Sequence, residues 1–409
     1  MAERMTDMPQ ALVAAANAVT WPSARIIFYY VAMFGTVGVM GPFLPVWLQS
    51  RALDPQEIGV VMAALAWTRV VVNPVAAHVA DTTGRRKRLA LLAASGACVG
   101  FAVATEAYGF FAVLAALTFT AACQGPVLPV GENLCLLTIR ARGLEYGRLR
   151  SWGSVAFIAV VTAAGFWLET APADHIVYML IAGWLMILAA VACLPDLRSP
   201  PRPRSERGFR AAPAWRLLRD GRFQLVLGAA AANMGAHAVL NSFSSIHWLE
   251  AGISESQIGY LWSVGVVAEI ILFWASAPIV RRLGPGWLMV LGAAGGVVRW
   301  LGLGWTTDLW LLMAFQTLHG LTFGAAHLGA MTYLQRYVPA EISATGQALY
   351  SALGMGVAMA LMQPVAGWLY QGYGGGAFYA MAALAAVGFG FAVLLARRLG
   401  KVAYSVGKV

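Results

Sequence analysis

The chain has 409 residues, of which 60% are hydrophobic and only 11% carry a charge. Soluble globular proteins average about 25% charged residues, so this composition excludes an ordinary water-soluble fold. The net charge of +10 would suggest nucleic-acid binding in a soluble protein, so the positions of the basic residues decide what the charge means.

Hydrophobic runs of about 20 residues, long enough to cross a hydrocarbon core of about 30 Å, recur along the whole sequence. Because these runs are apolar on all sides, without the alternation of barrel strands, they predict helices. The expected fold is therefore an all-α membrane protein with twelve transmembrane helices. In chain order, we expect these helices at residues 26–48, 57–80, 89–105, 110–131, 150–168, 176–195, 222–246, 257–280, 287–304, 309–333, 345–370 and 375–397.

The basic residues gather in alternate loops. They precede the first predicted helix and follow the even-numbered ones, whereas the loops on the other side hold Arg51 alone, beside several acidic residues. By the positive-inside rule, both termini and the central linker are expected in the cytoplasm. This asymmetry accounts for the positive charge, so we expect no nucleic-acid partner. The four cysteines show no paired spacing and predict neither a disulfide nor a metal site.

The second half of the sequence repeats the first at an offset of 200 residues. That offset aligns Gly84 with Gly284. It also aligns Arg69 of the second predicted helix with Glu269 of the eighth. A charge at the bilayer centre costs about 2.5–3.5 kcal/mol on insertion scales, so both residues are expected to face a partner or a wet cavity. The alternative is a structural clamp, in which each pairs with a local polar group such as Asn73.

The repeat predicts two pseudo-symmetric six-helix bundles. We expect them at residues 1–195 and 222–409. Residues 196–221 between them are rich in proline and arginine. Such a composition suits an extended cytoplasmic tether at an anionic membrane surface.

Polar side chains follow one face of the seventh and tenth predicted helices. Spacings of three and four residues place each set on one side of its helix. Single polar residues in membrane helices are usually packing contacts, but four in register on each of two helices indicate a water-accessible wall. The sets are Asn233, His237, Asn241 and Ser244, and Gln316, His319, Phe323 and His327.

Further charges lie within the predicted helices. Arg299 of the ninth helix is a cation that needs an anion, and Glu269 is the nearest candidate by helix order. In the first half, a short turn could bring Glu132 and Arg150 together, and Phe157 lies two helical turns beyond Arg150 on the same face. The alternative is a positive-inside arginine and a lipid-facing phenylalanine.

These features together resemble the major facilitator superfamily, within it the phenylpropionate permease group and, more distantly, lactose permease. The loop with Asp81, Gly84, Arg85 and Arg86 is similar to the superfamily's signature after the second helix, although Ala77 stands where glycine is usual. The resemblance implies that this loop acts as a conformational gate.

The stretch around Arg150 is similar to the lactose permease segment with the substrate-binding arginine. The resemblance places Phe157 at the position of the stacking tryptophan and Glu132 at that of the partner carboxylate. Since a phenylalanine replaces the tryptophan, a sugar would lose part of the aromatic surface on which it stacks.

Glu269, Arg299 and His319 likewise match the charged core of lactose permease. Three residues after the histidine, however, lactose permease has the glutamate assigned to proton transfer, and this chain has Thr322. The proton site therefore does not carry over directly. The threonine pattern is shared with the phenylpropionate group, which favours an aromatic acid over a disaccharide.

The resemblance implies proton-coupled uptake of a small organic substrate by alternating access. Phenylpropionate is the type of substrate expected, with Arg150 or Arg69 for its carboxylate. The full substrate site is expected to include Tyr30, Phe34, Arg69, Glu132, Arg150, Phe157, His237, Asn241 and His319.

Proton coupling is expected to depend on Glu269 and Arg299. Burial favours the neutral form of a carboxyl group and a nearby arginine favours the charged form, so relative movement of the two can load and release a proton. Glu132 and His319 are the other candidates. No cofactor is expected apart from the proton as the coupling ion.

Three other functions stay open. A sugar or nucleoside symporter would use Glu132 and Arg150 to bind hydroxyl groups, and a drug/proton antiporter would expel its substrate. A membrane sensor without transport is disfavoured by the short linker, and no motif indicates an enzyme. We expect a monomer in the bacterial inner membrane, with the bilayer and a small molecule as its partners.

Overall fold

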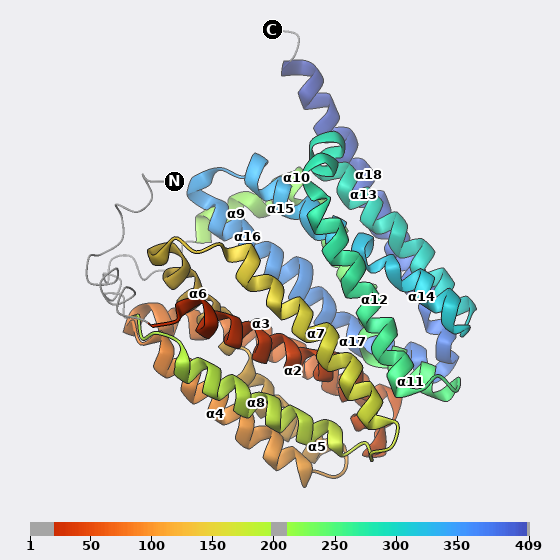
Figure 1. The fold of residues 1–409 in the computed structure, drawn as a ribbon. Coiled ribbons are helices and arrows are strands. Elements are labelled where there is room, and N and C mark those ends of the chain that lie inside the picture. The colour runs from red at the N-terminus through yellow and green to blue at the C-terminus, as the bar shows by residue number, and fades with distance from the viewer. Residues whose placement is uncertain (1–19, 198–210, 407–409) are drawn as a thin grey trace. The chain divides into compact units, whose positions relative to one another are not determined.

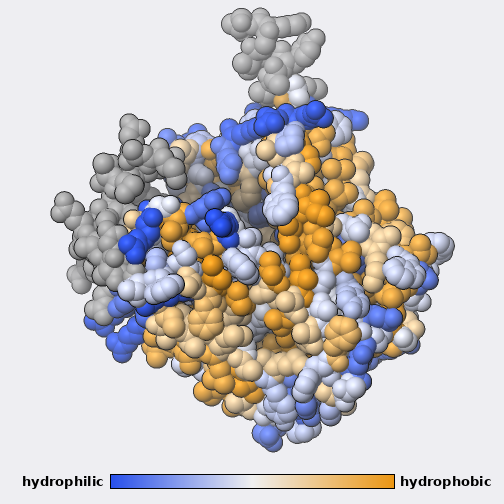
Figure 2. Space-filling model, in the orientation of Figure 1, coloured by the Kyte–Doolittle hydropathy of each residue, from blue (hydrophilic) through white to orange (hydrophobic). Residues whose placement is uncertain are grey.

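The computed structural model describes residues 20–197 and 211–406, which are almost entirely helical and contain no strand (Figure 1). Helices satisfy every backbone hydrogen bond within one segment, which a chain in lipid requires. Large apolar side chains such as Phe111, Trp274 and Trp310 are nevertheless exposed. Figure 2 shows hydrophobic residues over much of one face, as expected of surfaces that contact lipid.

The first half of the chain forms seven helices within residues 20–197. They are α2 (Pro22–Ser50), α3 (Pro55–Thr83), α4 (Arg86–Thr105), α5 (Phe110–Gln124), α6 (Val127–Arg142), α7 (Tyr146–Leu168) and α8 (His175–Cys193).

The second half is interrupted more often by 3-10 and π-helical turns. Its elements are α9 (Ala211–Leu218), α10 (Gly221–Gly235), α11 (Ala238–Glu250), α12 (Glu255–Trp274), α13 (Ser276–Trp305), α14 (Leu309–Thr317), η3 (Gly320–Ala325), α15 (Ala326–Tyr337), η4 (Ala340–Ile342), α16 (Ser343–Leu349), η5 (Tyr350–Val357), α17 (Ala358–Tyr373), η6 (Gly374–Gly376) and α18 (Ala377–Val406).

Within the described residues, eleven segments are long and apolar enough to cross a membrane. The last of them, Ala340–Gly400, contains two of the predicted helices, which the glycine turn η6 separates. The twelve predicted helices are thus confirmed. The predicted end of the eighth helix at residue 280 is wrong, because α12 ends at Trp274 and residues 276–283 belong to the next helical segment.

The chain forms two compact units. Of the described residues, one unit comprises 20–53 and 67–197, and the other comprises 54–66 and 211–406. The division thus places the first turns of α3 with the C-terminal unit. Residues 198–210 of the linker lie outside the described residues, and its C-terminal end forms α9.

The N-terminal unit is built around α2 and α4. Helix α2 packs against α7 and α8, while α4 packs against α5, α6 and α8. Gly38 permits the close crossing of α2 and α7, because a Cβ there would lie 2.9 Å from the carbonyl oxygen of Phe157. In the C-terminal unit, α13 and α10 both pack along α18, and α13 also contacts α15.

The loop between α3 and α4, which the resemblance implies to be a conformational gate, is a tight turn. Gly84 has a φ of 66°, in the left-handed region that favours glycine. Nη2 of Arg86 lies 3.1 Å from Oδ1 of Asp81 and ties the two helices together, with Arg85 at the N-cap of α4. Gly284, which the 200-residue offset aligns with Gly84, has a φ of 70° and kinks α13 in the same way.

Candidate functional site

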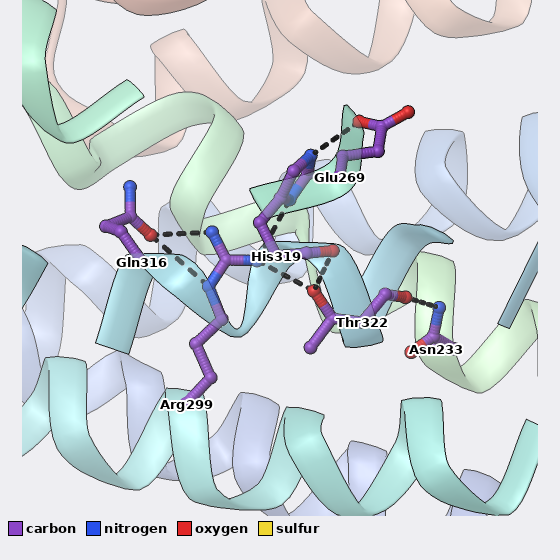
Figure 3. Close-up of polar contacts among 6 residues, drawn as sticks. All are labelled: Asn233, Glu269, Arg299, Gln316, His319 and Thr322. Carbon is purple, nitrogen blue, oxygen red and sulfur yellow. Dashed lines mark hydrogen bonds and ion pairs between the residues drawn. The ribbon is translucent and has the colours of Figure 1, made fainter. Parts of the chain in front are cut away.

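A buried arginine organises the polar contacts of the C-terminal unit. Arg299 on α13 is 1% exposed, so its guanidinium must find acceptors within the protein. Its Nε and Nη2 donate to Oε1 of Gln316 over 3.2 and 2.6 Å, and its Nη1 donates to Oγ1 of Thr322 over 2.8 Å. The same Nη1 lies 3.1 Å from Nδ1 of His319. We refer to the following residues as the C-terminal network (Figure 3): Asn233, Glu269, Arg299, Gln316, His319 and Thr322.

His319 joins Arg299 to Glu269. Its Nε2 lies 3.5 Å from Oε2 of Glu269, while its Nδ1 faces the guanidinium. Because a guanidinium can only donate, Nδ1 must accept, and Nε2 then carries the ring proton toward the carboxylate. Glu269, expected as the anion for Arg299, is reached through the histidine instead. The neutral groups of Gln316 and Thr322 accept the other hydrogen bonds of the buried cation, whose Cζ also lies 4.9 Å from the ring centroid of Trp300.

Glycine and a π-helical turn explain why these groups meet. Gly320 begins η3, and a Cβ at this position would lie 2.8 Å from the carbonyl oxygen of Ala268. The helix carrying His319 can therefore approach α12 closely enough for Glu269 to reach the ring. π-Helical turns inside helices occur frequently at functional sites.

The four polar residues predicted to line one face of the seventh span make different kinds of contact in the structure. Nδ2 of Asn233 donates to the carbonyl of Thr322 over 2.7 Å, and the carbonyl of Asn233 lies 2.8 Å from Nδ1 of His237. Within the described part of the chain, Asn241 makes a weak contact with a methionine sulfur at 3.9 Å, and Ser244 donates to a carbonyl of its own helix. Asn233 therefore belongs to the C-terminal network and His237 adjoins it, whereas Asn241 and Ser244 do neither.

His237 offers an unused polar atom beside the network. It lies between α10 and α11, with its ring edge-on to Trp300 at 4.9 Å and 6.2 Å from the ring of His319. Among the described residues, its buried Nε2 has no hydrogen-bond partner. A buried nitrogen of this kind is usually paired with a protein group or an ordered water molecule.

Arg150 dominates the polar contacts of the N-terminal unit. Its Cζ lies 3.7 Å from the ring centroid of Phe34 and 5.4 Å from that of Tyr30, both on α2. Gly153, one turn further along α7, makes this possible, because a Cβ there would lie 2.7 Å from the Phe34 ring. A guanidinium held against aromatic rings is a strong cation–π arrangement.

Glu132 joins the same cluster through tyrosines. Tyr146 donates to its Oε1 over 2.6 Å and Tyr30 donates over 3.3 Å. Tyr30 thus lies between Glu132 and Arg150, which form no direct ion pair among the described contacts. We refer to the following residues as the N-terminal cluster: Tyr30, Phe34, Glu132, Tyr146 and Arg150.

Two predictions for the N-terminal unit need correction. Phe157 does not supply the ring beside Arg150, because it is buried at the crossing of α2 and α7 and Phe34 takes that place. The suggested structural clamp between Arg69 and Asn73 is also absent from the described contacts. Nη2 of Arg69 instead lies 3.4 Å from Oε1 of Gln124.

The sequence interpretation missed Tyr146 and Gln124 as members of the site. Tyr146 lies one helical turn before Arg150, a spacing that places the two on one face of α7. Gln124 is the last residue of α5, where an apolar run ends. The first signal was available in the sequence, whereas the contact between α3 and α5 depends on the tertiary fold.

Comparison with known proteins agrees with this architecture. The sequence model of the protein family described as MFS_1 like family matches residues 24–381. The chain is 33% identical over 359 residues to the probable 3-phenylpropionic acid transporter of Escherichia coli strain K12, covering 87% of this chain and 93% of that protein. It is 29% identical over 379 residues to the maltose permease of Geobacillus stearothermophilus, covering 91% and 94% of the two chains.

Solved structures show the same fold at low identity. The nucleoside transporter NupG matches with a TM-score of 0.75 and 16% identity, over 93% of this chain and 98% of that one. The similarity of nearly the whole chain to membrane transporters is consistent with its two helical units. The chain is therefore a multi-pass secondary transporter that belongs to the MFS_1-like family of the major facilitator superfamily.

Proposed function

We propose that this transporter takes up a small aromatic carboxylate, such as 3-phenylpropionate, together with a proton. The observation that carries the proposal is the position of Arg150 against the rings of Phe34 and Tyr30. A guanidinium binds a carboxylate through paired charge-assisted hydrogen bonds. Aromatic rings beside it offer a surface for the ring of the same ligand.

The named relatives support this choice of substrate. The relative with 33% identity is a probable 3-phenylpropionic acid transporter. Its match extends over 87% of this chain and 93% of that protein. We infer the same class of substrate here.

Proton coupling is assigned to Glu269. Its carboxylate lies at one end of the C-terminal network, and His319 connects it to the buried charge of Arg299. Movement of His319 would change the electrostatic environment of the carboxylate, and with it the stability of the charged form. The network thus offers a carboxyl group whose proton occupancy depends on local conformation.

A sugar symporter is the second candidate, and the contacts of Glu132 favour it. Its carboxylate accepts from the hydroxyls of Tyr30 and Tyr146, an arrangement that could equally bind the hydroxyls of a sugar. A maltose permease is among the relatives. Competition of labelled phenylpropionate uptake by unlabelled phenylpropionate and by maltose distinguishes the two.

The substrate proposal is tested with purified protein in proteoliposomes, under a pH gradient that is acidic outside. We expect accumulation of labelled 3-phenylpropionate and a loss of about tenfold or more in Arg150→Gln, because a charged hydrogen bond contributes about 1.5–3 kcal/mol. Arg148→Gln is the matched control, since Arg148 is exposed two residues earlier on α7. Maltose competing as well as phenylpropionate would favour the sugar symporter.

Coupling is tested separately with Glu269→Gln. We expect this variant to lose gradient-driven accumulation but to keep counterflow, the exchange of labelled for unlabelled substrate without a gradient. If the variant accumulates substrate as the unmodified protein does, Glu269 is not the coupling group and Glu132 becomes the candidate.

A further inference from the structure

His327 is a polar residue of the tenth span that has no role in the function proposed above. It lies on α15, eight residues after His319, and is half-buried. Its Nδ1 is 3.2 Å from the hydroxyl of Tyr350, which is 4% exposed and begins the second π-helical segment, η5. A buried tyrosine hydroxyl thus fixes the orientation of the imidazole.

His319 and His327 face the same side of their helix. The ring of Phe323 stacks on that of His319 at 5.6 Å and 8°, and on that of His327 at 5.9 Å and 4°. In a regular α-helix, residues eight apart would be rotated by about 80° from each other. The π-helical turn η3 lies between the two histidines, and its wider winding keeps the three rings aligned.

Glu269 lies beside the helix between the two histidines. Its Cγ is 3.7 Å from where a Cβ of Gly324 would be, five residues after His319 and three before His327. Oε2 contacts His319 in this structure. Because Gly324 has no side chain, Glu269 and Leu272 of α12 both pack directly against this turn of the helix.

A small cavity adjoins the same residues. Asn233, Phe323, His327 and Tyr350 are among its lining residues, and it has about the volume that one water molecule needs. Three of these four side chains are polar, as a bound water requires. The cavity therefore links Asn233 of the C-terminal network to the imidazole of His327.

We propose that His327, oriented by Tyr350, is a second proton acceptor for Glu269, so that the carboxyl group exchanges its proton with His327 as well as contacting His319. This inference rests on the proton coupling proposed above. In the transfer, the O–H bond of the Glu269 carboxyl group breaks and an N–H bond forms at Nε2 of His327. Nδ1 of His327 carries its own proton and donates it in a hydrogen bond to the oxygen of Tyr350. The imidazolium then releases the proton from Nε2 to water.

The sequence indicates the direction in which the proton moves. His327 lies closer than His319 to Arg336, at the end of the span that the positive-inside rule predicts to be cytoplasmic. A proton on His327 is thus one step nearer to release into the cell. Tyr350 acts as a positioning residue in this scheme, since it holds the imidazole without exchanging the proton itself.

The first test does not require a known substrate. Infrared spectroscopy of the reconstituted protein follows the carboxyl band of Glu269 against pH, with Glu269→Gln to assign the band. We expect His327→Gln to displace the protonation midpoint by at least about half a pH unit, since removing a neighbouring titratable group changes the charge near the carboxyl. His247→Gln is the matched control, because His247 is a half-buried histidine of the same unit that packs against Tyr370 instead.

Transport provides the second readout. We expect His327→Gln to keep counterflow within about twofold while gradient-driven accumulation falls about tenfold, a loss equivalent to 1.4 kcal/mol. Tyr350→Phe retains the ring and is expected to show an intermediate loss together with a changed nitrogen-15 NMR tautomer signal for His327. An unchanged carboxyl midpoint in His327→Gln would overturn the inference. Absence of phenylpropionate counterflow in the unmodified protein would instead refute the proposed substrate and leave the infrared result valid.

Discussion

Arg299 and Gln316 form a two-pronged contact in which Nε and Nη2 of the buried guanidinium both donate to Oε1 of the amide, over 3.2 and 2.6 Å. A neutral side chain thus satisfies much of the hydrogen-bonding capacity of a cation that is 1% exposed. The amide of Gln316 also donates from Nε2 to the carbonyl of Leu261 over 3.3 Å. Gln316 therefore holds α12, α13 and α14 together around one charge.

We predict that Gln316→Leu destabilises the protein. The substitution leaves two buried donors of a charged group without acceptors, at a cost of about 2–4 kcal/mol. Thermal unfolding in detergent, followed by tryptophan fluorescence, measures the effect. Gln316→Glu is the control, since it restores an acceptor for Arg299. Equal stability of the leucine variant and the unmodified protein would show that Arg299 finds other acceptors.

The sequence was sufficient to predict the helices of this fold, because each apolar run is long and the loop charges alternate. It also identified Arg299, His319 and Glu269 as residues within the membrane-spanning helices. The order of contacts among them was not predictable, since helix order alone placed Glu269 next to Arg299. His319 lies between the two charges because of the π-helical turn that begins at Gly320. The sequence has no periodic pattern that predicts a π-helical turn.

Phe157 and Phe34 illustrate a second limit. Helical periodicity correctly places Phe157 on the side of α7 that carries Arg150, but it does not show which neighbouring helix covers that side. The close crossing at Gly38 buries Phe157 against α2, and the absence of a side chain at Gly153 admits the ring of Phe34 to Arg150. Tertiary packing therefore decided which aromatic residue meets the cation.

Phe34 should matter to substrate affinity through its contact with Arg150. We predict that Phe34→Leu raises the KM for phenylpropionate by about three- to thirtyfold, since a cation–π contact contributes about 0.5–2 kcal/mol. Phe34→Tyr keeps the aromatic face and should change KM by less than about threefold on the same scale. Initial uptake rates against substrate concentration give both values. A leucine variant with unchanged KM would remove Phe34 from the proposed binding site.

Arg51 connects several segments of the N-terminal unit. Its Nη2 lies 2.8 Å from Oδ1 of Asp174 and 3.1 Å from the carbonyl of Thr105, and its Cζ lies 4.4 Å from the ring centroid of Tyr108. These contacts join the end of α2 to the loops after α4 and before α8.

We predict that Arg51→Leu lowers the free energy of unfolding by about 1–3 kcal/mol. This loss is smaller than for a fully buried ion pair, because Asp174 is half exposed and partly solvated. Arg25→Leu is a suitable comparison, because Arg25 also bonds a backbone carbonyl, that of Cys193, but makes no ion pair among the described contacts. Thermal unfolding of both variants measures the difference. If the two variants lose equal stability, the ion pair of Arg51 with Asp174 contributes nothing measurable.

Gly59 allows the first turns of α3 to pack tightly against α17 within the C-terminal unit. A Cβ at Gly59 would lie 2.7 Å from the carbonyl oxygen of Gln363, and a Cβ at Gly367 would lie 2.4 Å from that of Pro55. Both neighbouring atoms are backbone, so they can move only if the helices separate. We predict that Gly59→Ala lowers the thermal stability by about 1–3 kcal/mol, the usual cost of overpacking.

Gly41→Ala is the matched control for this crossing. Gly41 lies within α2, and a Cβ at this position would meet nothing within 4 Å. Alanine there should be neutral or stabilise the helix by up to about 1 kcal/mol, because it restricts the unfolded chain without a clash. Thermal unfolding of the two variants side by side therefore separates the helix preference for alanine from the steric effect at Gly59. Equal stabilisation by both substitutions would mean that α3 and α17 do not pack this closely.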